Sequence, residues 1–275
     1  MQQSDAKRLA EIATTARQLT IESIYHAGTG HAGSSLSLVE ILVSLYFRHL
    51  RFDVLKPDEP DRDRLILSKG HAAPVLYTVL ALAGWYPVDW LKTLRQFGSP
   101  LQGHPKARVL PGIDVSTGSL GQGLSIGLGL ASGFKRLQRD SRVYCILGDG
   151  ELQEGQNWEA MMAAPALGAD NLVAIVDRNG LQNDGETESI ITLGDLVAKA
   201  RAFGWHAMAI DGHDLGQIDA ALTAARETPG RPTIVIAKTV KGKGISFMEN
   251  VVKWHHHPIS DDDYRQAMSE LSATR

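Results

Sequence analysis

Hydrophobic and polar residues alternate along the 275-residue chain with two different periods. Longer stretches repeat apolar residues at helical spacing, as in the stripe through Leu9, Ile12 and Ala16. Short apolar runs that end in turn-forming residues predict strands. The predicted helices span residues 4–27, 36–50, 73–83, 88–97, 120–138 and 215–227, and the predicted strands span residues 65–67, 143–147, 172–176, 206–210 and 233–238.

The order of these elements predicts the fold. Because strands alternate with helices, we expect an α/β fold with a doubly wound, mostly parallel sheet and helices on both faces. The Ser34-Ser35 pair is expected to cap the helix over 36–50, and residues 51–64 and 98–116 are expected to form loops. No internal repeat, low-complexity tract or linker interrupts the pattern, so residues 1–275 are expected to form one domain.

Polar side chains follow two of the predicted strands at the point where each strand ends. Asp149 comes after the run 143–147, inside a Gly-Asp-Gly turn, and Asn179 comes after the run 172–176. Parallel strands joined by a helix bring both residues to the edge of the sheet where α/β folds bind ligands. Their oxygens suit Mg²⁺, which takes its other ligands from water and phosphate. A plain turn or helix cap is the alternative, but the strand–turn–helix–strand context favours a site for a metal-bound diphosphate.

Composition narrows the function classes. Hydrophobic residues make up 43% and charged residues 21% of the chain, and the net charge of −3 gives no indication of nucleic acid or anionic membrane as a partner. No apolar run is long enough for a membrane span, and the N-terminus lacks the apolar core of a signal peptide. The single cysteine, Cys145, lies inside an apolar run, so we expect a buried thiol and a cytoplasmic protein.

Two common nucleotide-binding motifs are missing from the sequence. The glycines of the predicted helix 120–138 and its approach do not have the G-x-G-x-x-G spacing, and they do not directly follow a strand. There is also no G-x-x-x-x-G-K-[ST] motif. Small residues there are better explained by close packing against a helix or a cofactor.

The polar motifs together resemble the transketolase family. The segment from Gly148 to Asn179 resembles the thiamin-diphosphate motif, and Gly148-Asp-Gly-Glu-Leu-Gln-Glu-Gly155 is close to the transketolase form of it. Five further motifs follow the family order and cover roughly residues 10 to 265: Gly30-His-Ala-Gly33, Ser68-Lys-Gly-His-Ala72, Gly103-His-Pro105, Ser116-Thr-Gly-Ser-Leu-Gly-Gln-Gly123 and Lys241-Gly-Lys-Gly-Ile-Ser-Phe-Met248 with Trp254-His255. The resemblance implies a thiamin-diphosphate-binding fold.

The resemblance also implies a role for individual residues. Asp149, Asn179 and the backbone carbonyl of Leu181 would hold Mg²⁺, while His31 and His104 would face the ketose substrate and assist proton transfer. Glu154, also implied in catalysis, would meet its counterpart across a subunit interface near the cofactor. The residues implied in binding thiamin diphosphate are His71, Gly118, Leu120, Gly150, Asn179 and His255, of which His255 is also implied in catalysis. Asn183 departs from the family pattern, so its contacts with the site are open. The contacts of His256 and His257, which follow His255 directly, are open as well.

Full-length transketolases carry a pyrimidine-binding and a C-terminal domain after the part seen here. The resemblance therefore implies the N-terminal subunit of a split, two-chain transketolase, in an α2β2 assembly with the pyrimidine-binding half. It would transfer a two-carbon ketol unit between sugars or sugar phosphates. Alternatives are a 1-deoxyxylulose-phosphate-type synthase, a 2-oxo acid decarboxylating subunit, or a non-catalytic paralogue that acts in assembly. The sequence does not name the sugar.

Overall fold

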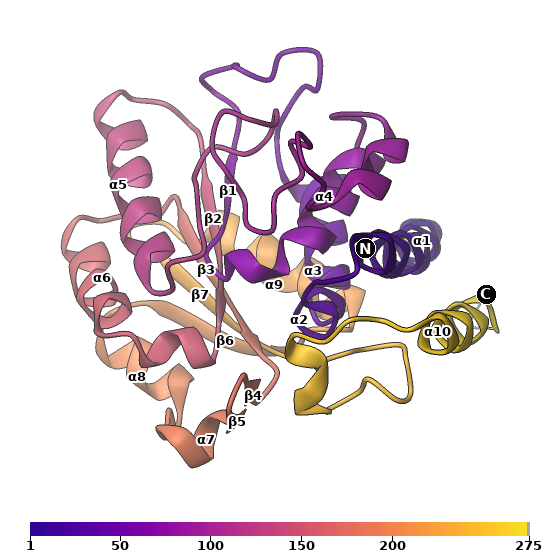
Figure 1. The fold of residues 1–275 in the computed structure, drawn as a ribbon. Coiled ribbons are helices and arrows are strands. Elements are labelled where there is room, and N and C mark those ends of the chain that lie inside the picture. The colour runs from indigo at the N-terminus through magenta and orange to yellow at the C-terminus, as the bar shows by residue number, and fades with distance from the viewer. Residues whose placement is uncertain (274–275) are drawn as a thin grey trace.

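A five-stranded parallel sheet forms the centre of the protein (Figure 1). The computed structural model describes residues 1–273. The strands are β1 (Arg64–Leu67), β2 (Val143–Gly148), β3 (Leu172–Arg178), β6 (His206–Asp211) and β7 (Thr233–Lys238), in the order β1-β2-β3-β7-β6. All neighbouring pairs in this sheet are parallel. The predicted strands and the α/β class are confirmed.

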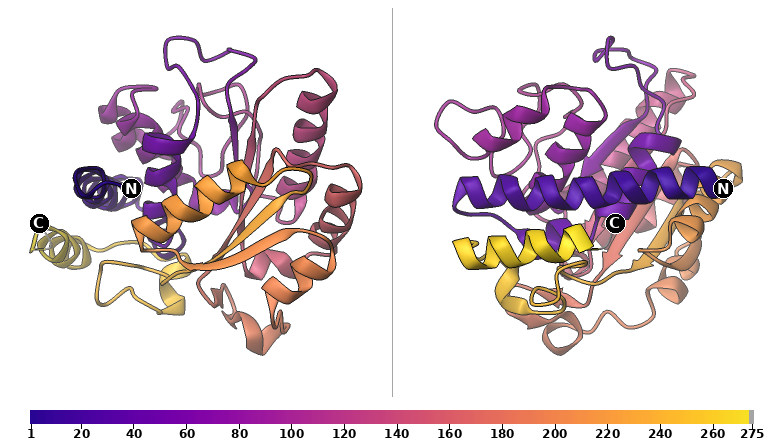
Figure 2. Two further views of the ribbon diagram at one scale, coloured as in Figure 1. Left: turned by 180° about the vertical axis from the view of Figure 1, so that it is seen from behind. Right: turned by 90° about the vertical axis from the view of Figure 1, so that its right-hand side faces the viewer.

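Helices cover both faces of the sheet, as predicted (Figures 1 and 2). One face carries α1 (Gln3–Ala27), α2 (Ala32–Leu36), α3 (Val39–Ser44), α4 (Ala73–Leu82) and α9 (Leu215–Glu227); the other carries α5 (Gln122–Arg136), α6 (Gly155–Ala166) and α8 (Leu196–Ala202). Alternate side chains of β2 enter two different cores, Tyr144 and Ile146 on the first face and Val143 and Cys145 on the second. Cys145 is fully buried, as predicted, and burial raises the pKa of its thiol.

Three helix predictions need correction. Residues 36–50 do not form one helix: α2 ends at Leu36, α3 follows, and a π-helix, η1 (Leu45–His49), completes the segment. The break falls where the Ser37 hydroxyl donates to Asp177 Oδ2 at 2.7 Å, a tertiary bond that a propensity argument cannot foresee. Ser34 and Ser35 lie inside α2 and do not cap a helix.

The other two differences lie at helix ends. The helix predicted over 88–97 is only the short 3₁₀ helix η3 (Val88–Thr93), because Leu94 leaves the helical region with ψ of 128° and Arg95 is left-handed with φ of 59°. Helix α5 begins at Gln122, two residues later than predicted, because Gly121 is left-handed with φ of 85°.

Several elements were not predicted individually. An antiparallel hairpin, β4 (Leu181–Gln182) with β5 (Gly185–Glu186), and the short helix α7 (Thr187–Ile190) follow β3 directly. Near the end of the chain, α10 (Asp261–Ala273) lies beside α1 (Figure 2). The rings of Tyr25 and Tyr264 stack between the two helices with centroids 4.2 Å apart. Among residues 1–273, no helix is both long and apolar enough to cross a membrane.

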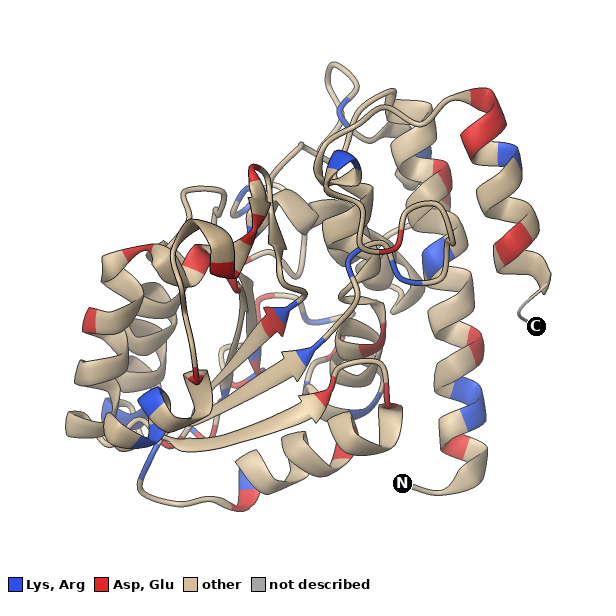
Figure 3. Ribbon diagram, turned by 90° about the horizontal axis from the view of Figure 1, so that it is seen from below, with Lys and Arg blue, Asp and Glu red and all other residues tan. Residues whose placement is uncertain are grey.

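Three strands of the sheet end in charged residues at its carboxyl edge (Figure 3). Asp177 and Arg178 end β3, Asp211 ends β6 and Lys238 ends β7. Short 3₁₀ helices at the same edge, η2 (Gly70–Ala72) and η4 (Gly150–Gln153), follow β1 and β2. The fold thus places charged and polar side chains together at the carboxyl edge of the sheet.

Candidate active site

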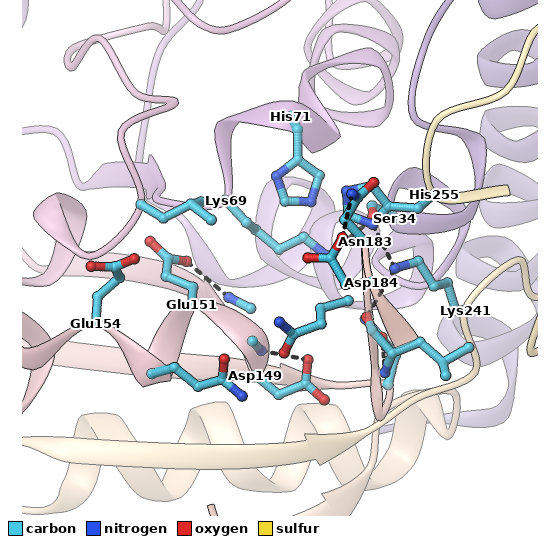
Figure 4. A pocket seen from close by; sticks show the side chains of 17 residues that line it. Ser34, Lys69, His71, Asp149, Glu151, Glu154, Asn183, Asp184, Lys241 and His255 are labelled. Atoms are coloured by element: carbon cyan, nitrogen blue, oxygen red, sulfur yellow. Dashed lines mark hydrogen bonds between the residues drawn. The ribbon is translucent and has the colours of Figure 1, made fainter. Parts of the chain in front are cut away.

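A pocket of about 260 Å³ lies at the carboxyl ends of β1, β2 and β3 (Figure 4). Among its lining residues are five predicted at the ends of β2 and β3: Asp149, Gly150, Glu154, Asn179 and Leu181. This is the edge at which open α/β sheets bind ligands.

The remaining predicted residues divide between the pocket and its surroundings. His71, Leu120 and His255 also line the pocket. His31 contacts the pocket histidines without lining the pocket itself, and Gly118 lies against the ring of His104. The structure therefore brings distant parts of the chain to one place.

Asp149 is held by the backbone and by one arginine. Its Oδ1 accepts from Gly150 N at 2.8 Å, and its Oδ2 accepts from Gly180 N at 2.6 Å and from Arg178 Nη1 at 3.2 Å. Burial, followed by the nearby charge of Asp177, raises the pKa of the Asp149 carboxyl above its ordinary value. A carboxylate held this way has little rotational freedom. Its charged form is costly in free energy, and a bound cation would lower that cost.

The donor set at this edge fits a magnesium ion. Asn179 Nδ2 donates to Asp177 Oδ2 at 2.9 Å, which orients the amide, and the Leu181 carbonyl accepts from Lys241 Nζ at 2.9 Å. The carbonyl therefore faces the pocket and already has a cationic partner. Residues 1–273 contain no group of three or more His, Cys, Asp or Glu arranged to hold a metal. One carboxylate, one amide oxygen and one backbone carbonyl are nevertheless hard oxygen ligands that suit Mg²⁺ with phosphate and water.

Two buried lysines beside the pocket were missed by the sequence analysis. Lys69 Nζ donates to Asp177 Oδ2, and both side chains are almost fully buried. Lys241 has no carboxylate partner among the described residues, and burial followed by the charge of Lys69 lowers its pKa to about 8. Lys69 is therefore neutralised by Asp177, whereas Lys241 presents an uncompensated positive charge to the pocket. Both lie in segments that the family motifs cover, but a lysine in a loop gives no signal of burial.

Glu151 was also missed, although it directly follows the Gly-Asp-Gly turn. Its Oε1 accepts from the Ser68 hydroxyl and from Gly121 N at 2.9 Å, and its Oε2 accepts from Gly148 N at 3.0 Å. Burial raises the pKa of this carboxyl. The side chain joins the ends of β1 and β2 to the start of α5.

The four predicted histidines form one cluster, together with His256. The ring of His31 lies 5.1 Å from that of His71, 5.4 Å from His255 and 6.3 Å from His104. His256 lies closest to it, with ring centroids 4.7 Å apart. Histidines separated by more than 200 positions in the sequence thus meet beside the pocket.

Burial lowers the pKa of His31, His71, His104 and His255. Burial, and after it the neighbouring His255, lowers the pKa of His31 to about 3. Burial, and after it the charge of Lys241, lowers the pKa of His255 to about 3. The pKa of His104 is lowered by burial and then by Arg95. Neutral imidazole offers one donor and one acceptor nitrogen, which suits hydrogen bonding to hydroxyl and carbonyl oxygens.

Two glycines allow close approaches near the pocket. A Cβ atom at Gly118 would lie 2.9 Å from Cδ2 of His104, and Gly118 has φ of 137°. A Cβ atom at Gly121 would lie 2.7 Å from Cβ of Glu154. Glu154 is exposed and directly precedes α6. The absence of a side chain at Gly118 therefore leaves room for the His104 ring.

The structure also places the three residues whose contacts the sequence left open. Asn183 lines the pocket and donates to Asp184 Oδ1 at 3.1 Å. His256 joins the histidine cluster. His257 packs against the Trp254 ring, and its Nδ1 lies 2.7 Å from the Pro258 carbonyl. Asn183 and His256 thus belong to the site region, whereas His257 is engaged elsewhere.

A parallel α/β sheet with polar side chains and a buried lysine at its carboxyl edge is typical of domains that bind an anionic ligand there. Residues 9–274 match the family described as "Transketolase, thiamine diphosphate binding domain". The chain belongs to the transketolase family and contains its thiamine-diphosphate-binding domain. This confirms the family resemblance.

Several relatives share the length of this chain. It is 43% identical over 270 residues to the 6-deoxy-6-sulfo-D-fructose transketolase subunit SqwG of a Clostridium species (strain MSTE9), covering 98% of this chain and 97% of that protein. It is 41% identical over 256 residues to an apulose-4-phosphate transketolase subunit from Phocaeicola vulgatus, covering 93% of this chain and 91% of that protein.

Full-length transketolases match over part of their length. The chain is 41% identical to human transketolase over 271 residues, covering 97% of this chain and 43% of that protein. The structure of transketolase from Campylobacter jejuni superposes with a TM-score of 0.90 at 34% identity, covering 96% of this chain and 42% of that one. The chain thus spans about two fifths of the full-length enzymes and corresponds to their thiamine-diphosphate-binding part.

Proposed function

We propose that this chain is the thiamin-diphosphate- and Mg²⁺-binding subunit of a two-chain transketolase. The observation that carries the proposal is the convergence of Asp149, Asn179 and the Leu181 carbonyl with the Lys241 ammonium in one pocket. The oxygens suit a magnesium ion, and the lysine suits the diphosphate that the ion would accompany. The enzyme would transfer a two-carbon ketol unit between a ketose and an aldose.

Each part of the pocket has a distinct task in this proposal. Asp149 and Asn179 hold the metal, and Lys241, His71 and His255 donate hydrogen bonds to diphosphate oxygens. Gly150 lets the diphosphate approach the backbone closely, while Leu120 covers the cofactor at the lip of the pocket. Thiamin diphosphate supplies an electron sink for the carbanion that forms during ketol transfer.

His31 and His104 act on the sugar. As neutral imidazoles they hydrogen-bond the hydroxyl and carbonyl oxygens of the ketose and move protons between them. Gly118 allows the His104 ring to reach this position. Glu154, exposed beside Gly121, meets a second subunit near the cofactor.

In this proposal a partner supplies the parts of full-length transketolases that the chain does not cover. Residues 1–275 form one domain in the proposal, and a second polypeptide carries the pyrimidine-binding half, in an α2β2 assembly. The relatives of equal length support this arrangement because they are named as subunits. The single buried cysteine is consistent with a cytoplasmic enzyme. A sugar phosphate or a sulfonated sugar serves as substrate.

Isolation of the tagged chain from its native host tests the proposal. We expect a partner in equal stoichiometry, by native mass spectrometry, and ketol transfer that requires thiamin diphosphate, Mg²⁺ and both chains. Ketol transfer by this chain unaided would contradict the two-chain part. Consumption of pyruvate with formation of a deoxy sugar, and no ketol transfer, would replace the reaction by that of a deoxyxylulose-type synthase.

A further inference from the structure

The segment that carries Lys241 is held on both sides by side chains from other parts of the chain. Val240 N, directly before Lys241, donates to Nε2 of His213 at 2.8 Å. The Lys243 carbonyl, two residues after Lys241, accepts from Nε of Arg17 at 3.1 Å. Lys241 itself is almost fully buried. The backbone on either side of this lysine is therefore fixed by contacts outside its own loop.

The bond from Val240 fixes the tautomer of His213. A backbone N–H only donates, so Nε2 is the acceptor and the proton of the neutral ring is on Nδ1. Nδ1 lies 3.0 Å from Oε2 of Glu40 and donates to it. His213 thus connects a backbone amide on one side to a carboxylate on the other.

Glu40 in turn connects His213 to Arg17. Its Oε1 accepts from Nη2 of Arg17, and both of these side chains are buried. Burial alone would raise the pKa of the Glu40 carboxyl, but the charge of Arg17 and the hydrogen bond from His213 outweigh burial and lower it. The carboxylate is therefore charged and has a donor on each oxygen. We call Arg17, Glu40 and His213 the supporting cluster.

The fixed backbone determines where the Lys241 side chain begins. Gly242 N donates to the Gly33 carbonyl at 3.0 Å. A Cβ atom at Gly33 would lie 3.0 Å from Cγ of Lys241, so the lysine stem passes closely over this glycine. A long side chain loses rotamer freedom when it is buried. Its ammonium reaches one defined position only if the backbone that carries it is held in place.

His213 itself does not line the cofactor pocket. It lies in the loop between β6 and α9, and β6 is at the edge of the sheet opposite β1. Lys241 does line the pocket, and its ammonium donates to the Leu181 carbonyl there (Figure 4). An influence of His213 on a bound diphosphate therefore passes through Val240 and Lys241.

We propose that His213 is a positioning residue for diphosphate binding: through Val240 N it holds the backbone of Lys241 so that the ammonium points into the cofactor pocket. The inference rests on the proposed function and adds a residue that contacts neither cofactor nor substrate. The two ring nitrogens have separate tasks. Nε2 holds Val240, and Nδ1 orients the ring through Glu40.

Two conservative replacements separate positioning from a purely structural role. In His213→Gln the side-chain amide reaches the place of Nε2 and still accepts from Val240 N. In His213→Asn the shorter amide reaches only the place of Nδ1 and keeps the contact with Glu40. Each variant loses one hydrogen bond of the ring, so a purely structural role predicts equal effects, whereas positioning predicts a defect in His213→Asn alone.

The test titrates thiamin diphosphate with Mg²⁺ into the complex of this chain with its partner subunit. The Kd should rise by about tenfold or more in His213→Asn and by less than about threefold in His213→Gln. The KM for the ketose at saturating cofactor should stay within about twofold in both variants. Equal changes of Kd in the two variants would overturn the positioning role.

A double-mutant cycle tests whether the effect passes through Lys241. Combined with Lys241→Met, His213→Asn should have little further effect on the Kd, because no ammonium remains to be positioned. Additive losses would overturn the proposal. His206→Asn is the matched control, since His206 is a half-buried histidine at the start of β6, and it should leave the Kd unchanged.

A second measurement does not depend on ketol transfer. Inorganic diphosphate with Mg²⁺, titrated into this chain alone, should bind the wild type and His213→Gln more tightly than His213→Asn. If the complex transfers no ketol unit but this order of affinities holds, the proposed function fails and the positioning role stands. Absence of diphosphate binding by the wild type, or equal affinity in all three proteins, would overturn the positioning role.

Discussion

Lys241 Nζ lies 2.8 Å from Nδ1 of His255. Because an ammonium only donates, Nδ1 of the neutral His255 ring is the acceptor, and the ring proton is on Nε2. The pair therefore presents two donors, the ammonium and the Nε2 proton, to the same anion. Lys241 fixes the tautomer of His255 as well as supplying charge.

Cofactor affinity should depend on the protonation of Lys241. With its pKa at about 8 in the free site, diphosphate binding should weaken by about tenfold per pH unit above that value. Lys241→Met should bind weakly at all pH values and lose this step, whereas Lys241→Arg should keep its charge at high pH. Titration of thiamin diphosphate with Mg²⁺ from about pH 6.5 to about pH 9.5 brackets this pKa and measures the profile. If the affinity of Lys241→Met still decreased above about pH 8, the pH dependence would belong to another group.

The same lysine has an effect of opposite sign on stability. Its folded pKa lies below its ordinary value of 10.5, so between these two values the unfolded chain binds more protons. Burial of the ammonium therefore costs stability at neutral pH, and this cost decreases as the pH rises from about 8. Lys241→Met should unfold at equal or higher urea concentration than the wild type at neutral pH, which separates a binding defect from misfolding.

Removal of the Asp149 carboxylate should abolish metal-dependent cofactor binding without unfolding the chain. Asp149→Ala loses a metal ligand, while the hydrogen-bond donors of Gly150 and Gly180 remain near solvent at the pocket. Calorimetric titration of Mg²⁺ with thiamin diphosphate should show no Mg²⁺-dependent binding. Asp89→Ala, an exposed carboxylate on η3, is the control and should bind normally. Retained metal dependence in Asp149→Ala would remove Asp149 from the metal site.

His104 should matter more for turnover than for cofactor affinity. It lies outside the pocket and faces the substrate in the proposed function. His104→Ala should lower kcat by about 10²–10⁴-fold, the range for loss of a proton-transfer group, with little change in thiamin diphosphate affinity. Gly118→Ala should reproduce the defect in part, because its Cβ displaces the His104 ring. Equal losses in kcat and in cofactor affinity would move His104 to the cofactor.

The buried pair of Lys69 and Asp177 should dominate local stability. Asp177 is fully buried and also accepts hydrogen bonds from Ser37 and Thr239. Asp177→Asn leaves the Lys69 ammonium without a counterion, so the free energy of unfolding should fall by about 3–5 kcal/mol. Urea unfolding followed by circular dichroism at neutral pH measures this. Lys69→Met in the same chain should restore part of the loss, and no recovery would mean that the two side chains act independently.

The pair also predicts the direction of acid sensitivity. Burial alone would raise the pKa of the Asp177 carboxyl, but the charge of Lys69 and the hydrogen bonds to Asp177 outweigh burial and lower it. Its stabilising contribution is thus present above the unfolded value of 3.8 and is lost as the pH falls through the lower folded value. Asp177→Asn should flatten this acid limb of the stability curve.

The sequence predicted the sheet well because its strands are short apolar runs that end in polar turns, a pattern set by burial itself. The edge residues Asp149 and Asn179 followed from the same pattern, since parallel strands align their carboxyl ends. Helix boundaries were less predictable where a tertiary contact intervenes, as at Ser37, or where a non-glycine residue is left-handed, as at Arg95. Neither feature leaves a periodic signal.

The missed site residues share a different cause. Lys69, Lys241 and Glu151 are charged residues that a sequence argument places on the surface, and each is buried only because distant segments meet around it. Lys241 contacts His255, 14 positions further along the chain, and Lys69 contacts Asp177, 108 positions further along. A sequence pattern cannot show such pairs until the fold brings them together.

Glu151 determines how much change this edge of the protein can accept. A single carboxylate ties together three segments of the chain, and each of its oxygens has its own set of donors. Aspartate is one carbon too short to reach them, and glutamine replaces one acceptor by a donor. In a saturation library selected for activity, position 151 should therefore accept almost no replacement, while the exposed positions of the neighbouring helix α6 vary freely.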